Sequence, residues 1–126
     1  MSMLKILATT LLGFLPMTAL ADTYLLMAEE TGCAWCERWN REIAEIYPKT
    51  PEGRAAPLRR FDKSDGAPVE ISLARPVAFT PTFILINNDV EMGRIEGYPG
   101  EDFFWGLLGM MLDRAGIAME STDNAG

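Results

Sequence analysis

Two closely spaced cysteines constrain this sequence more than any other feature. Cys33 and Cys36 are the only cysteines in the chain, and they stand where an apolar run over 24–28 gives way to a helical pattern of apolar residues. The point where a strand ends and a helix begins is the usual place for chemistry in an α/β sheet. The spacing therefore predicts a redox-active pair of thiols at the start of a helix.

The expected placement of the two sulfurs gives them different roles. A cysteine at the first turn of a helix faces unpaired backbone N–H groups and the positive end of the helix dipole, which favour the attacking species, the thiolate. A helix end supplies roughly 0.3–1 kcal/mol, whereas one pKa unit corresponds to about 1.4 kcal/mol. A hydrogen bond from the second cysteine therefore has to contribute. We predict that Cys33, nearer the helix start, is the nucleophile and that Cys36 is the resolving thiol.

Composition excludes several kinds of chemistry. The chain has 126 residues and no histidine, which removes His-dependent triads, His-ligated zinc and imidazole acid–base catalysis. The formal net charge of −7 argues against nucleic acid as a partner, because phosphate neutralisation dominates such binding. We expect neither a cofactor nor a metal. A Cu(I)-binding module built from the two thiolates and Met27 stays open as a rival, since soft ligands select that ion.

The N-terminus has the features of a secretory signal. Lys5 precedes an apolar run over 6–15, and positions 19–21 offer Ala-Leu-Ala as a small-x-small cleavage site. The pattern predicts a signal peptide at 1–21 and a single domain at 22–126, with a buried apolar helix as the alternative for the first segment. Both cysteines remain in the exported part, where an oxidising compartment permits disulfide chemistry. Closing so small a loop removes little unfolded-state entropy, so chemistry explains the pair better than a structural staple does.

Apolar patterning predicts an α/β domain. We expect strands over 24–28, 58–62, 83–86 and 90–96, a helix from the cysteines to about Tyr47, and a last helix over 102–114. The first two strands and the helix between them form a βαβ unit, and Asn87-Asn88-Asp89 predicts a hairpin between the last two strands. Pro48 and Pro51 are expected to end the first helix and to open a surface connection over 48–57. The segment 64–78 stays open between a short helix and an extended stretch.

Two helical stripes define the expected core. Trp39, Ile43 and Ile46 lie on one side of the first helix, which is typical of core packing. The last helix should end at Gly116. Its sheet-covering face is predicted to consist of Phe103, Phe104, Leu107, Leu108, Met111 and Leu112.

The order of these parts resembles the thioredoxin superfamily. Three features carry the resemblance over about 24–115: Cys33-Ala34-Trp35-Cys36 at a helix start, Thr80-Pro81 before the third strand, and Gly97 after the hairpin. The resemblance implies a thioredoxin-like α/β fold, with a minimal four-stranded mixed sheet in the order 2-1-3-4 flanked by helices. It also implies that Pro81 follows a cis peptide bond and that Thr80 offers backbone groups to an incoming peptide. Trp35 either contacts the partner or merely packs on its own helix.

The chain also departs from the standard thioredoxin pattern. No room remains after Ala21 for a strand and a helix ahead of the active unit, and Ala34-Trp35 stands where thioredoxin has Gly-Pro. Met27 occupies the place of the family's buried aspartate beneath the dithiol, with Glu29 or Glu30 as candidate substitutes. The identity of the proton-transfer partner is therefore left open.

A closer likeness within the superfamily is to the small periplasmic thioredoxins encoded in bacterial sulfur-oxidation clusters, through the segment TGCAWCERWNREI and the exported N-terminus. That likeness implies a periplasmic reductase that keeps the sulfur-carrier protein of sulfur oxidation in its thiol state, with electrons from a membrane thiol transporter. We expect a monomer. The sequence leaves the direction of electron flow open, but the two glutamates before Cys33 oppose thiolate formation and favour a reductase. A cytochrome-maturation module and a non-catalytic partner-binding domain remain as alternatives.

Overall fold

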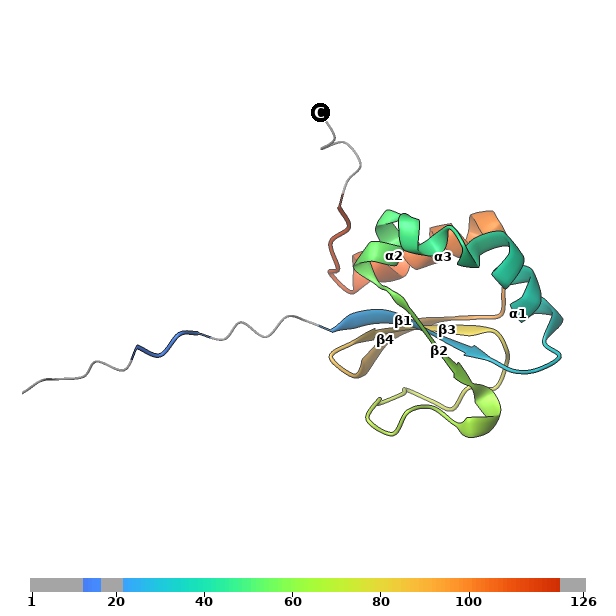
Figure 1. Ribbon diagram of the computed structural model, residues 1–126, viewed down its shortest axis with the longest axis horizontal. Coiled ribbons are helices and arrows are strands. Elements are labelled where there is room, and N and C mark those ends of the chain that lie inside the picture. Colours follow the sequence, from blue (N-terminus) through green and yellow to red (C-terminus); the bar gives the residue numbers. More distant parts are fainter. Residues whose placement is uncertain (1–12, 17–21, 121–126) are drawn as a thin grey trace, which may run out of the picture.

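A four-stranded sheet forms the centre of the molecule (Figure 1). The computed structural model describes residues 13–16 and 22–120. The strands are β1 Thr23–Glu29, β2 Leu58–Asp62, β3 Thr82–Asn87 and β4 Val90–Glu96. They follow the order β2-β1-β3-β4, with β1 parallel to β2 and antiparallel to β3. The thioredoxin-like fold, the mixed sheet and the strand order implied by the resemblance are thus confirmed.

The expected signal peptide at 1–21 lies outside the described residues except for 13–16, so it stays a prediction. Within the described ranges, no helix is long and apolar enough to cross a membrane. The domain's contacts begin at Asp22, whose backbone N–H donates to Asn88 Oδ1 at 3.1 Å.

β1 and β3 lie in the middle of the sheet because both of their faces are apolar. Every position inside these two strands is buried. Side chains alternate between the two faces of a strand. The face toward the helices therefore carries Leu25, Met27, Phe83 and Leu85, and the opposite face carries Tyr24, Leu26, Ile84 and Ile86.

Helices cover one face of the sheet (Figure 1). They are α1 Ala34–Trp39, a π-helical turn Asn40–Ala44, a 3₁₀ turn Tyr47–Lys49, α2 Pro51–Ala55 and α3 Glu101–Arg114. The connection over 48–57 lies largely at the surface, as expected, but it contains two short helical pieces and buries Gly53 and Ala56. Pro51 begins α2, where its missing N–H leaves no hydrogen bond unmade, and the Gly53 N–H donates to Thr50 Oγ1 at 3.0 Å.

The π-helical turn changes which side chains face the core. The predicted stripe includes Ile46, but this residue is 43% exposed. A π turn holds more residues than an α turn and so rotates the side chains that follow it. Tyr47 takes the buried position instead, and its hydroxyl donates to the carbonyl oxygen of Ala56 at 2.6 Å. The prediction is wrong for Ile46 and confirmed for Trp39 and Ile43, which are fully buried.

α3 buries a narrower stripe than the sequence predicts. Phe104, Leu108 and Leu112 are fully buried, but Phe103 is 71% exposed and Leu107 is 39% exposed. The fully buried side chains are spaced four residues apart along one row of the helix. Met111 and Trp105 are partly buried and pack against the same core beside this row. The assignment of Phe103 and Leu107 to the core is therefore wrong.

Two predicted turns are made by residues with positive φ. Asn88 and Asp89, with φ of 51° and 64°, connect β3 to β4, which is the geometry of a type I′ hairpin. Gly116, with φ of 69°, ends α3 as expected, and beyond it the Ile117 N–H donates to the Leu112 carbonyl oxygen at 2.9 Å.

The segment that the sequence left open crosses the second face of the sheet. After a 3₁₀ turn at Lys63–Asp65 it contains no helix before β3. Ile71, Leu73 and Val77 pack on the apolar residues of that face. The helix alternative is therefore wrong here, and the segment covers the sheet with irregular and extended backbone.

Candidate active site

The two cysteines are joined in a disulfide at the start of α1. Their Cα atoms are 5.2 Å apart. Cys33 is the N-cap residue, with extended backbone at φ −82° and ψ 101°, and its Sγ accepts a hydrogen bond from the Cys36 N–H at 3.1 Å. The Cys33 side chain is partly exposed, whereas Cys36 is 3% exposed and belongs to the core. Only Cys33 is therefore open to a visiting molecule.

The backbone around Cys33 is set by its neighbours in sequence. Gly32 has a φ of 81°, a conformation that a side chain would disfavour. The Cys33 N–H donates to the Glu30 carbonyl oxygen at 3.3 Å, and the Cys33 carbonyl oxygen accepts from the Glu37 N–H at 3.1 Å. This turn aims the sulfur at the Cys36 N–H, a donor that would also stabilise a thiolate at Cys33 in the reduced protein.

A cis peptide bond joins Thr80 to Pro81, as the family resemblance implied. The Pro81 carbonyl oxygen accepts from the Gly97 N–H at 2.7 Å, and Gly97 has a φ of 86°. The Thr82 hydroxyl donates to the Phe79 carbonyl oxygen at 2.7 Å. The loop before β3 is therefore hydrogen-bonded to Gly97, which follows β4, and to Thr82, the first residue of β3.

Glu30 links the cysteine loop to the cis-proline loop. Its backbone carbonyl binds the Cys33 N–H, and its side-chain Oε1 accepts from the Thr80 hydroxyl at 3.1 Å. Glu29 is instead paired with Arg60 at 2.7 Å. Met27, in the place of the family's aspartate, is fully buried. Of the two candidate carboxylates, Glu30 is thus the one that contacts both loops of the site.

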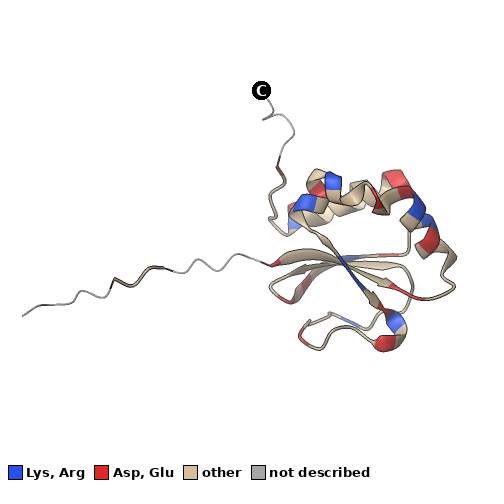
Figure 2. Ribbon diagram, viewed as in Figure 1, with Lys and Arg blue, Asp and Glu red and all other residues tan. Residues whose placement is uncertain are grey.

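A polar network that sequence reasoning missed lies beside Trp35. The Arg38 guanidinium carbon Cζ lies 5.5 Å from the centre of the Trp35 ring and 5.9 Å from the centre of the Tyr98 ring, which is a cation–π arrangement. Arg38 Nε also donates to Glu42 Oε1 at 2.7 Å, and the Tyr98 hydroxyl donates to Glu42 Oε2 at 2.5 Å. Figure 2 shows acidic and basic residues side by side along this helical segment. Residues 35, 38 and 42 are spaced three and four positions apart, and this helical spacing is the sequence signal from which contacts among their side chains can be predicted.

The network shifts the pKa values of its members. The hydrogen bond from Tyr98 and then the one from Arg38 lower the pKa of Glu42 below its ordinary value. Burial, and then the bond to Glu42, raises the pKa of Tyr98 well above its ordinary value. Glu42 is therefore a carboxylate and Tyr98 a neutral phenol at neutral pH.

The chain was compared with known proteins. No protein-family model matches it, and no curated protein matches it. Among solved structures it is similar to the periplasmic thioredoxin SoxS from Paracoccus pantotrophus in its reduced form, with 55% sequence identity and a TM-score of 0.73. The match covers 75% of this chain and 99% of that one. This chain is a SoxS-type member of the thioredoxin superfamily.

As a SoxS-type thioredoxin whose two cysteines lie at disulfide distance, the protein is a thiol–disulfide oxidoreductase. Of the predicted site residues, Cys33 lies at the start of α1 and Thr80 and Pro81 lie in the loop before β3, and Glu30 bridges these two places. Cys36 lies inside the first turn of α1, joined to Cys33 by the disulfide. The fifth, Trp35, stands on α1 with 54% of its surface exposed.

Proposed function

We propose that this SoxS-type thioredoxin reduces a disulfide on a periplasmic partner protein. Cys33 is the attacking sulfur and Cys36 the resolving one, and the partner's peptide lies on Trp35, Thr80 and Pro81. The unequal exposure of the disulfide carries the proposal. Cys33 is partly open to solvent, next to a loop that Glu30 ties to the cis-proline, whereas Cys36 is almost fully buried.

The reaction is thiol–disulfide exchange in two steps. The Cys33 thiolate first attacks one sulfur of the partner's disulfide, so that an S–S bond forms between the proteins and the other partner sulfur leaves as a thiolate. Cys36 then loses its proton and attacks Cys33 Sγ, which breaks the mixed disulfide and releases the second partner sulfur. The two partner sulfurs take up two protons, two electrons have passed to the partner, and Cys33 is joined to Cys36 as in this structure.

Thr80 is suited to hold the partner's backbone. Its N–H and C=O have no hydrogen-bond partner within the described part of the chain, and β3 begins only at Thr82. Pro81 has no N–H and so cannot extend the sheet at this point. An extended peptide can therefore pair with Thr80 much as a strand would, with Trp35 exposed on the adjoining helix.

The partner that we propose is the disulfide-bearing carrier protein of a sulfur-oxidation system, with a membrane thiol transporter as the electron donor. The likeness to the periplasmic thioredoxin SoxS supports this choice over a cytochrome-maturation role. Glu30 supports reduction, because it stands three residues before Cys33 with its carboxylate on the cis-proline loop, and negative charge on this side of the site opposes the strongly stabilised thiolate that an oxidant needs. Export through the signal at 1–21, a periplasmic location and a monomeric state belong to the same proposal.

The reduction potential and insulin reduction together test this function. We expect a potential closer to that of thioredoxin, at about −270 mV, than to that of a strong oxidant, at about −120 mV. We also expect catalysis of insulin reduction with dithiothreitol as the electron source. A potential near that of the strong oxidant, or no catalysis by the correctly folded protein, would contradict the proposal.

The Cu(I)-binding rival gains no support from the region around the dithiol. Met27 Sδ lies 3.6 Å from the Arg60 guanidinium, and that positive charge opposes a second cation. Within the described ranges, no group of three or more His, Cys, Asp or Glu side chains is placed to hold a metal. Copper titration separates the two functions: turnover without metal supports exchange, whereas tight one-to-one copper without insulin reduction supports the module.

A further inference from the structure

A buried arginine on β4 reaches across to the segment that precedes the cis-proline. The Arg94 side chain is only 5% exposed. Its Nε and Nη2 donate to Glu91 Oε1 at 3.0 and 2.5 Å, its Nη2 donates to the Arg75 carbonyl oxygen at 2.8 Å, and its Nη1 donates to the Pro76 carbonyl oxygen at 3.4 Å. A charge is tolerated inside a protein only when its partners satisfy it. Two of these three partners are backbone groups of one loop, and Glu96 Oε1 also lies 3.7 Å from Nη1.

Several other polar contacts attach this loop within the described residues. Arg75 Nη2 donates to Glu96 Oε1 on β4 at 2.6 Å, and the Thr80 hydroxyl donates to Glu30 Oε1 at 3.1 Å. At its start, Ser72 exchanges backbone hydrogen bonds with the hairpin, through its N–H to Asp89 at 2.8 Å and through its carbonyl oxygen to Glu91 at 3.2 Å. Beyond Arg94, the next bond is between the Phe79 carbonyl oxygen and Thr82. Arg94 therefore fixes the middle of a stretch that ends, four residues after Pro76, at Thr80.

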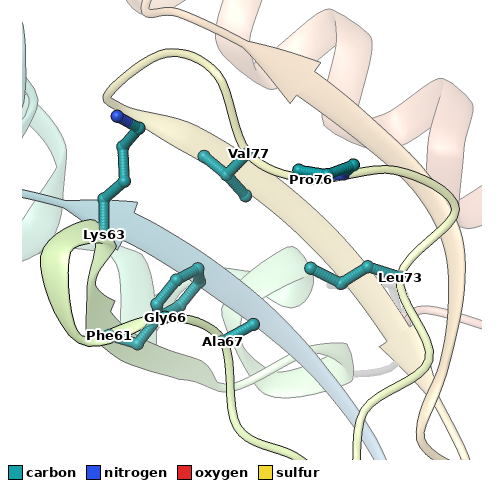
Figure 3. A pocket seen from close by; sticks show the side chains of 7 residues that line it. All are labelled: Phe61, Lys63, Gly66, Ala67, Leu73, Pro76 and Val77. Carbon is teal, nitrogen blue, oxygen red and sulfur yellow. The ribbon is translucent and has the colours of Figure 1, made fainter.

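Apolar packing alone does not fix this loop. A hollow of about 200 Å³ lies beneath it, against β2. Its lining consists of Phe61, Lys63, Gly66, Ala67, Leu73, Pro76 and Val77. Figure 3 shows Leu73, Pro76 and Val77 of the loop facing Phe61 across this space. The space leaves the loop room to shift on this side, so its position also depends on polar contacts with β4. Arg94 binds the Arg75 and Pro76 carbonyl oxygens, and the Arg75 side chain binds Glu96.

We propose that Arg94 is a positioning residue for disulfide exchange. By binding the Arg75 and Pro76 carbonyl oxygens from within the sheet, it holds the stretch 77–80 in place, so that the Thr80 backbone is preset to receive the partner's peptide. This inference rests on the proposed role of Thr80. The planar guanidinium can bind a carboxylate and two carbonyls at once, which the single ammonium of a lysine cannot do with the same geometry.

The test is Arg94→Gln, with Arg59→Gln as the matched control. Arg59 carries its charge over the Tyr24 ring and beside Asp22, and among the described residues it makes no hydrogen bond or ion pair with the loop. We expect Arg94→Gln to raise KM for insulin about tenfold with little change in kcat, because a displaced loop weakens binding of the peptide. The rate with a small disulfide such as 5,5′-dithiobis(2-nitrobenzoic acid), which needs no peptide groove, should stay as in the wild type. The control should leave all three constants unchanged.

Arg94→Lys covers the case in which the glutamine variant does not fold. The lysine keeps a cation beside the buried Glu91 carboxylate but lacks the planar guanidinium that binds both carbonyl oxygens. KM for insulin should therefore rise by a smaller factor than in Arg94→Gln. An unchanged KM in a folded variant would overturn the proposal. So would an equal loss of rate with the small disulfide, since it would place the effect on the dithiol.

Backbone NMR order parameters of residues 77–80 separate this inference from the proposed function. Lower order parameters are expected in Arg94→Gln and not in Arg59→Gln, whether or not the wild type reduces insulin. If the wild type fails to reduce insulin while residues 77–80 become more mobile in the variant, the proposed function is wrong and the positioning role of Arg94 is supported. Unchanged order parameters would contradict that positioning role itself.

Discussion

The two cysteines differ in what surrounds them, and that difference comes from one helix start. Spacing alone places Cys33 at the N-cap and Cys36 inside the first turn, so their unequal exposure could be predicted from the sequence. The Arg38–Glu42–Tyr98 network could not, because Tyr98 comes from a turn far along the chain. Sequence periodicity reports which residues share a helix face, and it does not report what another segment brings to that face.

Glu42 gives a prediction about acid stability. Its pKa is lowered by the bonds from Tyr98 and Arg38, so the carboxylate stabilises the fold above its ordinary pKa and this contribution is lost as the pH falls through the lowered value. Glu42→Gln should therefore reduce the difference in unfolding free energy between pH 7 and pH 3, measured by urea denaturation. Glu45→Gln, on the same helical segment but without a side-chain hydrogen bond in the described structure, is the control. An unchanged difference in Glu42→Gln would show that the network is not formed in solution.

At the scale of elements, the strands were predicted well and the helix faces less well. The runs that became β1 and β3 are apolar at every position, and such runs leave little choice of structure. Ile46 was misplaced because a π turn leaves no mark in the apolar pattern. Leu107 was misplaced because the apolar stripe on α3 is wider than the surface that it covers. The segment at 64–78 has no periodicity at all, and contacts with distant residues such as Arg94 set its course.

Two leucines on α3 test the observed helix face. Leu108 is fully buried and Leu107 is 39% exposed. Leu108→Ala should cost about 2–5 kcal/mol of unfolding free energy by leaving a cavity, whereas the exposed position should cost less than about 1 kcal/mol. Thermal or urea denaturation of the two variants measures both. Equal losses would mean that α3 sits on the sheet in a different rotation.

At the scale of the whole molecule, the fold is a single four-stranded sheet whose two faces are packed against different kinds of structure. Helices cover the face that carries Leu25 and Phe83, and the segment leading to the cis-proline covers the other. The segment that covers the second face thus continues into the loop with Thr80, the residue that we propose to bind the partner's peptide. The contacts of this segment through Ser72 and Arg94 therefore connect the packing of the sheet to that residue.

The predicted cleavage after Ala21 falls just before the first residue that contacts the domain, Asp22. Cleavage after Ala21 would leave Asp22 as the first residue, with its backbone nitrogen still 3.1 Å from Asn88 Oδ1 and its carboxylate 3.2 Å from the Arg59 guanidinium. We expect the protein recovered from the periplasm to begin at Asp22 and to unfold at the same temperature as a chain produced as 22–126. Intact mass and a thermal scan measure the two quantities. Recovery of the protein with 1–21 still attached would contradict the signal assignment.

Trapping of the mixed disulfide tests the central claim most directly. Cys36→Ser removes the resolving sulfur, so Cys33 should remain covalently bound to the partner, and mass spectrometry of the species should locate the bond at Cys33 and name the partner. Cys33→Ser, with the buried sulfur alone, should trap none. If Cys36→Ser forms no reducible adduct, or if both variants form the same one, the protein does not exchange disulfides in the way that its site indicates.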